Sequence, residues 1–351
     1  PLYIIPIDVD IYTAAGKQTH KIEIREADST YSFNVAQEPL CVNADAKKVT
    51  LCEKDDIRSA SQWAYLFYNG ENFTDRFEAI KECSPLNSEE AHKVLMDALN
   101  DKFWYIRELA VKNLKKLCKS KGDQVKAKLI DMIANDPKPS VRSSAVRNIQ
   151  KYFKDDASLL PVFQKAAEDS SYDVMSEAFL ALAKTDPKTG LELARKHEKE
   201  KSGTVREAIA QIYAESGTAS DHTFFKDAIS KGSGLEKYSL MIHYGTYLKR
   251  MGYDETDKGL ALIKEVATGE SGWFVRLSAY QTLSILETHY DKKALEAQTL
   301  AESLRMDGKT MEATEAERDM MKSKGMVEKI AKMVEELKAN ETDKNVLKYI
   351  H

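Results

Sequence analysis

The sequence predicts a mostly α-helical protein: a right-handed solenoid of paired helices (an α/α superhelix) preceded by a small, partial β-sandwich. Three observations support this prediction. Apolar and polar residues alternate with a period of two in residues 1–54, and the helical period takes over in residues 55–351. A single motif recurs every 31 to 35 residues along the helical region. We therefore expect two domains, residues 1–54 and residues 55–351.

The first 54 residues are expected to form about five short strands, because alternation marks half-buried strands and Gly16 supplies a turn after the first. So few strands do not close two packed sheets, so we expect the rest of the sandwich to precede Pro1. The alternating segments are residues 5–11, 22–24, 31–35, 40–42 and 49–51.

About sixteen helices with short connections are expected after residue 55, and a repeated motif runs through them. It consists of an acidic residue, four variable positions, an aliphatic residue, Arg, two variable positions and Ala. Met175 replaces Arg in one copy, and a missing copy would centre near Leu240. The aliphatic positions are Ile106, Val141, Val174, Val205 and Val275.

Each residue type in the motif has a physical reason. A carboxylate at or just before the second helix of a pair accepts hydrogen bonds from free N–H groups and meets the positive helix end. The aliphatic residue and Ala are expected to face the neighbouring repeat, and Arg to bridge to the acidic residue of an adjacent repeat. The predicted ladder comprises Asp101, Arg107, Asp136, Arg142, Asp169, Glu200, Arg206, Glu270 and Arg276.

Helix pairs with this motif resemble HEAT repeats. The resemblance is informative about architecture but not about function, because such solenoids occur in scaffolds, transport adaptors and enzymes.

Composition and charge exclude several classes of protein. The net charge of −4 gives no broad basic footprint, so nucleic-acid binding is not expected, although a local basic patch stays open. No apolar run is long enough to span a membrane, so we expect a soluble protein. The start at Pro1 has neither an initiator Met nor the basic region of a signal peptide. We therefore expect a fragment whose targeting signal would lie upstream, which leaves the localisation unknown.

Motifs for chemistry are missing from the sequence. A zinc peptidase helix needs His-Glu-x-x-His, but the position of the second His after His197-Glu198 is Lys201. The seven histidines, of which His351 is the last, are scattered and are interpreted as surface or structural residues. We therefore predict no catalytic residue, no metal ligand and no cofactor in this chain. The four cysteines form no Cys-x-x-Cys pair; Cys41 and Cys52 are either free thiols or face each other across neighbouring strands.

Two further features allow two interpretations each. Aromatic residues at 103–105 and 273–274 stand just before the aliphatic–Arg step of two repeats. They either pack between repeats or line the inner wall of the superhelix as a ligand or peptide contact. The apolar stripe of Val327, Ile330, Val334 and Leu337 fits a helix that caps the array or an amphipathic helix that binds a partner or a membrane.

The β segment carries a more specific resemblance. Residues 6–12, Gly16-Lys17 and residues 20–24 are similar to the small β-sandwich domain of the aminopeptidase N-type zinc metallopeptidase family. Residues 39–47 resemble that family's strand and loop of pattern Pro-hydrophobic-x-Val-Asn-x-Asp. Residues 73–79 are similar to the step at which the family passes from sandwich to helices.

The resemblance implies a parent enzyme that uses zinc to remove N-terminal residues from peptides. The zinc and substrate motifs of that family would precede Pro1, so no catalytic residue carries over and this chain is expected to be inactive alone. Its role would be to cover the active-site cavity and restrict substrate size. Its partners would be the catalytic domain of the same parent chain and the peptide substrate. The alternative is a free-standing HEAT scaffold that binds a partner protein in its concave face.

Overall fold

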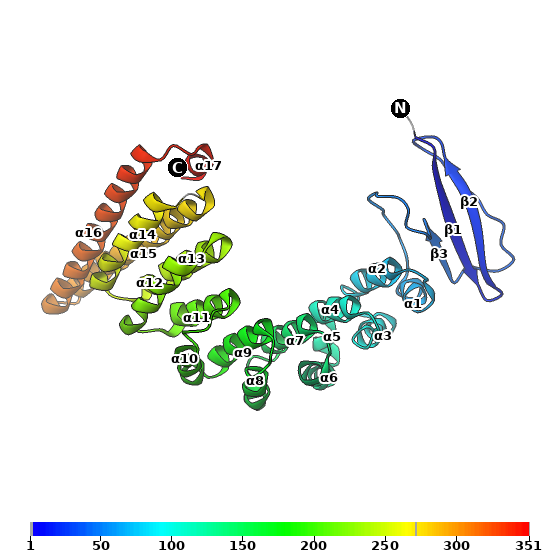
Figure 1. The fold of residues 1–351 in the computed structure, drawn as a ribbon, viewed down its shortest axis with the longest axis horizontal. Helices are drawn as coiled ribbons and strands as arrows, with labels where there is room; N and C mark the ends of the chain where they lie inside the picture. The colour runs from blue at the N-terminus through cyan, green and yellow to red at the C-terminus, as the bar shows by residue number, and fades with distance from the viewer. Residues whose placement is uncertain (1–2, 271, 351) are drawn as a thin grey trace. The chain divides into compact units, whose positions relative to one another are not determined.

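The computed structural model describes residues 3–270 and 272–350. Pro1, where the sequence was interpreted as the start of a fragment, and His351 lie outside the described residues. The chain divides into two compact units, residues 1–156 and residues 157–351. Figure 1 shows a small sheet followed by helices in the first unit and helices alone in the second.

The sheet of the first unit has three antiparallel strands in the order β2-β1-β3. β1 and β2 form a hairpin, and Gly16 at its turn has a φ of +121°, a conformation that side chains with a Cβ rarely adopt. Val9 of β1 lies opposite His20 of β2 and Ala44 of β3. The strand bounds are β1 Ile5–Thr13, β2 Gly16–Ile24 and β3 Cys41–Ala44.

The two faces of this sheet differ in polarity. The register places the alternating aliphatic residues of β1, such as Ile7 and Val9, on one face. Tyr12, Cys41 and Asn43 share the other face and are buried. The ring of Tyr12 lies 5.5 Å from the ring of Tyr65 in the first helix, so this second face packs against the helices.

The prediction of two further strands, in residues 31–35 and 49–51, is wrong. The alternating side chains of the first segment pack onto β2 instead: Phe33 lies 4.7 Å from the His20 ring, and the Tyr31 hydroxyl donates to the Glu23 carbonyl. In the second segment the backbone N–H groups of Val49 and Thr50 donate to the carboxylate of Asp45. A side chain thus takes the donors that a neighbouring strand would have used.

The helices of the first unit stack in pairs. The second helix of one pair contacts the second helix of the next, from α2 to α4 and from α4 to α7. The bounds are α1 Ala60–Asn69, α2 Phe73–Cys83, α3 Glu89–Ala98, α4 Trp104–Lys112, α5 Lys115–Ser120, α6 Gly122–Asn135 and α7 Pro139–Tyr152.

The second unit repeats this arrangement, with contacts from α9 to α11, α11 to α13 and α13 to α15. Two short 3₁₀ helices, Ala157–Leu159 and Ala219–Asp221, precede α8 and α12. The bounds are α8 Leu160–Ala166, α9 Tyr172–Thr185, α10 Pro187–Lys196, α11 Gly203–Ser216, α12 His222–Lys231, α13 Gly234–Arg250, α14 Tyr253–Gly269, α15 Trp273–Met306, α16 Thr310–Asn340 and α17 Lys344–Tyr349.

The motif's apolar positions form the core between repeats. Ile106 and Ala110 of α4 and Val141 and Ala145 of α7 are all fully buried. A small residue one turn after a β-branched or aliphatic one allows close approach of the neighbouring helix, and burial of each aliphatic side chain contributes about 1.5–3 kcal/mol. The repeated motif therefore supplies the same kind of apolar contact between one helix pair and the next.

The last helices close the stack of the second unit. α16 packs along α14 and α15, and Ile330 and Leu337 of the predicted stripe are buried. This packing is that of a terminal cap. Among the described residues, the structure contains no helix with the length and hydropathy needed to cross a membrane.

Candidate functional site

The acidic residues of the motif lie just before the second helix of a pair, where they bind backbone N–H groups. A carboxylate oxygen of Asp101 accepts from the N–H of Phe103 at 2.8 Å, and that of Asp136 accepts from Lys138 at 2.9 Å. In the second unit Asp169 accepts from Ser171 at 2.8 Å. These bonds satisfy donors that a helix start leaves without intrahelical acceptors.

Arg107 connects its repeat to the next one in the first unit. Arg107 donates two bonds to the carboxylate of Asp136, from Nε at 2.7 Å and from Nη2 at 2.8 Å. Its third nitrogen, Nη1, donates to the carbonyl of Asp101 at 2.9 Å. One guanidinium thus holds the turn before its own helix and the acidic residue of the following repeat. Arg142 makes the same backbone contact, from Nη1 to the Asp136 carbonyl at 2.9 Å.

In the second unit the arginines pair with residues outside the motif. Arg206 pairs with Glu236, and Arg276 pairs with Glu341 through Nε at 2.9 Å. Glu200, which was predicted to belong to the ladder, instead lies 3.7 Å from the ring nitrogen of His197.

Glu270 belongs to the ladder, but its partner is a residue that the motif did not predict. It pairs with Lys237 at 2.6 Å, so a lysine supplies the cation in the copy that lacks Arg. The motif missed this lysine because it lies three residues before the expected centre at Leu240. It also missed Arg76, which lies 2.9 Å from Asp101 in the first unit.

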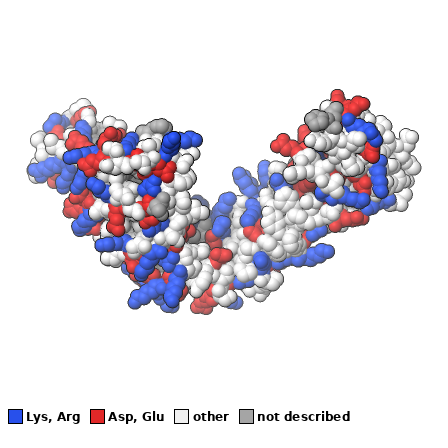
Figure 2. Space-filling view, turned by 45° about the horizontal axis from the view of Figure 1, so that its top comes forward, with Lys and Arg blue, Asp and Glu red and all other residues white. Residues whose placement is uncertain are grey.

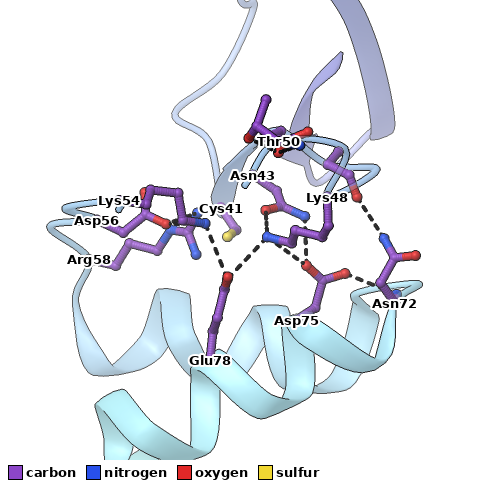
Figure 3. A network of polar contacts seen from close by, with 12 residues as sticks. Cys41, Asn43, Lys48, Thr50, Lys54, Asp56, Arg58, Asn72, Asp75 and Glu78 are labelled. Atoms are coloured by element: carbon purple, nitrogen blue, oxygen red, sulfur yellow. Dashed lines mark hydrogen bonds and ion pairs between the residues drawn. The ribbon is translucent and has the colours of Figure 1, made fainter. Parts of the chain in front are cut away.

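A second polar network joins the sheet to the helices of the first unit. We call it the sheet–helix joint and define it as Asn43, Asp45, Lys48, Asn72, Asp75 and Glu78. Figure 3 labels all of these residues except Asp45. The Asn43 amide of β3 donates to Asp75 of α2 at 3.0 Å. The Asn72 amide donates to the carbonyl of Ala46 at 2.6 Å, and the Asn72 N–H donates to Asp75 at 3.0 Å. Hydrogen bonds therefore run from β3 to α2 and from the residue before α2 back to the loop that follows β3.

Lys48 supplies the central cation of the joint. Its Nζ lies 3.2 Å from Asp75 and 3.1 Å from both Glu78 and the Asn43 carbonyl oxygen. The side chain of Asp75 is 1% exposed and that of Lys48 is 14% exposed. A carboxylate so deeply buried is expected to be paired and hydrogen-bonded, and this one has a cation and two N–H donors.

The loop of the joint is shaped by Asp45, which has a φ of +49°. Burial alone would raise the pKa of Asp45, but the hydroxyl and N–H of Thr50 and the N–H of Val49 outweigh it and hold the pKa below its ordinary value. The carboxylate therefore stays ionised at neutral pH and fixes the turn.

The cysteines of the chain are free. Cys41 is buried in β3 and Cys52 is exposed, so the two do not form a disulfide. Burial raises the pKa of the Cys41 thiol, and it raises that of Cys83 to about 12. These thiols are therefore protonated at neutral pH and are poor nucleophiles.

Within residues 3–270 and 272–350, no group of three or more His, Cys, Asp or Glu side chains is placed to hold a metal ion. Basic and acidic side chains are interspersed on the face that Figure 2 shows, in keeping with the small net charge.

Comparison with protein families matches residues 62–150 and 126–214 to HEAT repeats. The matches begin in α1 and end in α11, and they confirm the HEAT-like architecture that the motif predicts. Comparison with curated proteins gives no match.

Several solved structures are similar to this chain at low identity. The Escherichia coli protein YibA shares 15% identity, with a TM-score of 0.47 and coverage of 77% of this chain and 99% of that one. The CpcE–CpcF complex of phycocyanin lyase from Nostoc shares 13%, with a TM-score of 0.44 and coverage of 78% and 98%. Aminopeptidase A of Legionella pneumophila shares 12%, with a TM-score of 0.45. The alignment covers 98% of this chain but 44% of the Legionella enzyme.

Proposed function

We propose that this chain is the non-catalytic C-terminal region of a zinc aminopeptidase, whose helical repeats cover the active-site cavity and restrict which peptides enter. In this proposal residues 1–54 belong to a β-sandwich domain and residues 55–351 to the helical repeat domain. The partners are the catalytic domain of the same parent chain and the peptide substrate, and the zinc ion belongs to the catalytic domain.

The sheet–helix joint is the observation that carries the proposal. The two segments that resemble the aminopeptidase family, residues 39–47 and residues 73–79, are 26 or more positions apart in the sequence. They meet in one buried network, in which Asn43 donates to Asp75 and Asn72 donates to Ala46. A connection of this kind supports the proposal, because it fixes the first helices of the array on the sheet that carries them.

The coding sequence upstream of Pro1 tests the proposal directly. We expect an open reading frame that extends several hundred residues upstream and encodes His-Glu-x-x-His on a predicted helix. A stop codon just before the codon for Pro1 would contradict the proposal and favour the free-standing HEAT scaffold.

The pure chain provides a second test. After incubation with Zn²⁺ and removal of excess metal, we expect no hydrolysis of aminoacyl chromogenic substrates. Hydrolysis that increases in proportion to the concentration of the chain, and that a chelator abolishes, would overturn the assignment of a non-catalytic role.

A further inference from the structure

The first unit carries an exposed cluster of aromatic side chains at the starts of α2 and α4. We call it the aromatic patch and define it as Phe73, Phe77, Phe103, Trp104 and Tyr105. Phe73, Phe103 and Tyr105 are 37%, 39% and 37% exposed. Aromatic rings this large are usually buried more fully in a monomer, and a contiguous exposed group of them marks an interaction surface.

The rings of the patch form one continuous surface across two repeats. Phe73 of α2 lies 5.3 Å from Phe103, edge to face at 89°, and 5.9 Å from Tyr105. Phe77 is stacked on Tyr105 at 15° with the centroids 6.3 Å apart. Contacts between these rings hold the surface in one shape before any partner binds, which lowers the entropy lost on binding. The rings therefore pack between repeats and stay partly exposed.

Lysines surround the aromatic patch. The Nζ of Lys81 lies 5.4 Å from the centre of the Phe77 ring, and that of Lys138 lies 4.7 Å from the centre of the Trp104 ring. Lys102 directly precedes Phe103 and is exposed. No carboxylate within the described parts of the chain pairs with any of these three lysines. These three lysines form a rim around the aromatic patch, and their cations are available to a partner.

Two acidic residues beside these lysines, Asp101 and Asp136, do not neutralise them, because both carboxylates are already paired with arginines. Asp101 pairs with Arg76 at 2.9 Å, and Asp136 accepts the hydrogen bonds from Nε and Nη2 of Arg107. The arginines and acidic residues of the ladder thus cancel each other, whereas the lysines around the aromatic rings keep a net positive charge. A partner complementary to this surface carries negative charge next to large apolar groups.

We propose that the aromatic patch binds an extended peptide segment in which acidic side chains alternate with large apolar ones. The apolar side chains pack on Phe73, Phe103 and Tyr105, and the carboxylates pair with Lys81, Lys102 and Lys138. A nucleic acid fits less well, because the edge-to-face rings offer few open faces for stacked bases and the chain has a net charge of −4. This inference does not depend on the proposed function of the chain.

The test uses the full chain and a short fluorescein-labelled peptide of alternating Glu and Leu or Phe, with fluorescence anisotropy as the readout. We expect binding that weakens as salt increases. We expect the charge variant K102E/K138E and the ring variant F103S/Y105S each to weaken binding about tenfold or more. These positions are exposed, so the variants should keep the circular dichroism spectrum and thermal midpoint of the wild type.

Two control variants match these changes outside the patch. K115E/K119E reverses two exposed lysines of α5, and Tyr172→Ser removes a ring that is 48% exposed at the start of α9. Both should bind the peptide as the wild type does. The proposal is overturned if the patch variants also bind normally, or if a peptide with Lys in place of Glu binds equally well. Tighter binding of oligothymidylate, or no binding of the acidic peptide at all, would overturn it too.

Discussion

Asp75 is the residue on which the sheet–helix joint depends most directly. We expect Asp75→Ala to lower the free energy of unfolding by about 3–5 kcal/mol. The substitution takes a carboxylate partner from the largely buried cation of Lys48, and it removes the oxygens that accept hydrogen bonds from Asn43 and Asn72. Urea unfolding followed by circular dichroism measures this loss. Asp131→Ala is the control: Asp131 is 52% exposed and pairs with Lys128, so its loss should cost less than about 1 kcal/mol. Equal losses of unfolding free energy in the two variants would show that the joint stabilises the fold no more than an exposed ion pair does.

Glu341 makes a residue-scale prediction about pH. Hydrogen bonds from Arg276 hold the pKa of Glu341 below its ordinary value, and the N–H groups of Asp343 and Thr342 add to this against the effect of burial. A carboxylate whose pKa is lowered by folding stabilises the folded state above its unfolded pKa of about 4.3, and this contribution is lost as the pH falls through that value toward the folded pKa.

Glu341→Gln should therefore be less stable than the wild type at pH 7, by about 1–3 kcal/mol. The difference in unfolding free energy between the two proteins should shrink as the pH is lowered below about 4.3, because the wild-type carboxylate then becomes protonated and is neutral, like the amide of the variant. Unfolding curves of both proteins from pH 7 to pH 3 measure this. A difference that stays constant over the whole range would mean that the charge of Glu341 is not what stabilises the contact.

At the scale of helices, the ladder predicts that a lost arginine uncouples neighbouring repeats. Arg107→Met removes both bonds to Asp136 and the bond to the Asp101 carbonyl, so we expect a loss of about 3 kcal/mol in unfolding free energy. The double variant Arg107→Met/Asp136→Leu should lose less than the sum of the two single changes, since no buried charge is left without a partner.

The same substitution at an exposed ion pair is the matched control for the ladder. Arg25→Met breaks a pair with Glu23 in which the arginine side chain is 62% exposed. It should change the unfolding free energy by less than about 1 kcal/mol. Strict additivity in the Arg107 and Asp136 double variant would contradict the coupling of α4 to α7.

At the scale of the whole molecule, a chain built from repeats that contact their neighbours should lose structure locally. In Asp75→Ala we expect faster amide exchange in β3, α1 and α2, with the protection of α13 to α16 unchanged, because each solenoid repeat is stabilised by its adjacent repeats. Hydrogen-exchange mass spectrometry resolves these segments. A uniform loss of protection along all helices would mean that the chain unfolds as a single cooperative unit.

The helical repeats could be predicted from the sequence because their signals are local. The spacing of Ile106, Val141 and Val174 follows the length of one helix pair, and each of these residues is fully buried. The short strands could be predicted less well. Alternation in residues 31–35 and 49–51 has the period of a strand, yet side chains such as Asp45 bind the backbone that a strand would have offered. Period alone does not reveal which group satisfies a backbone N–H.

The sequence by itself determined the paired helices, their repeat length, and the Asp and Arg positions that hold each turn, since all of these depend on residues within one repeat. Only the tertiary structure decided which acidic residue meets each arginine, as with Glu236 for Arg206 and Glu341 for Arg276. It also brought Asn43 to Asp75 and assembled the aromatic patch from two helix starts. The physical reason is that these contacts depend on how helices and strands stack in space, and residues 30 to 65 positions apart carry no local signal of their distance.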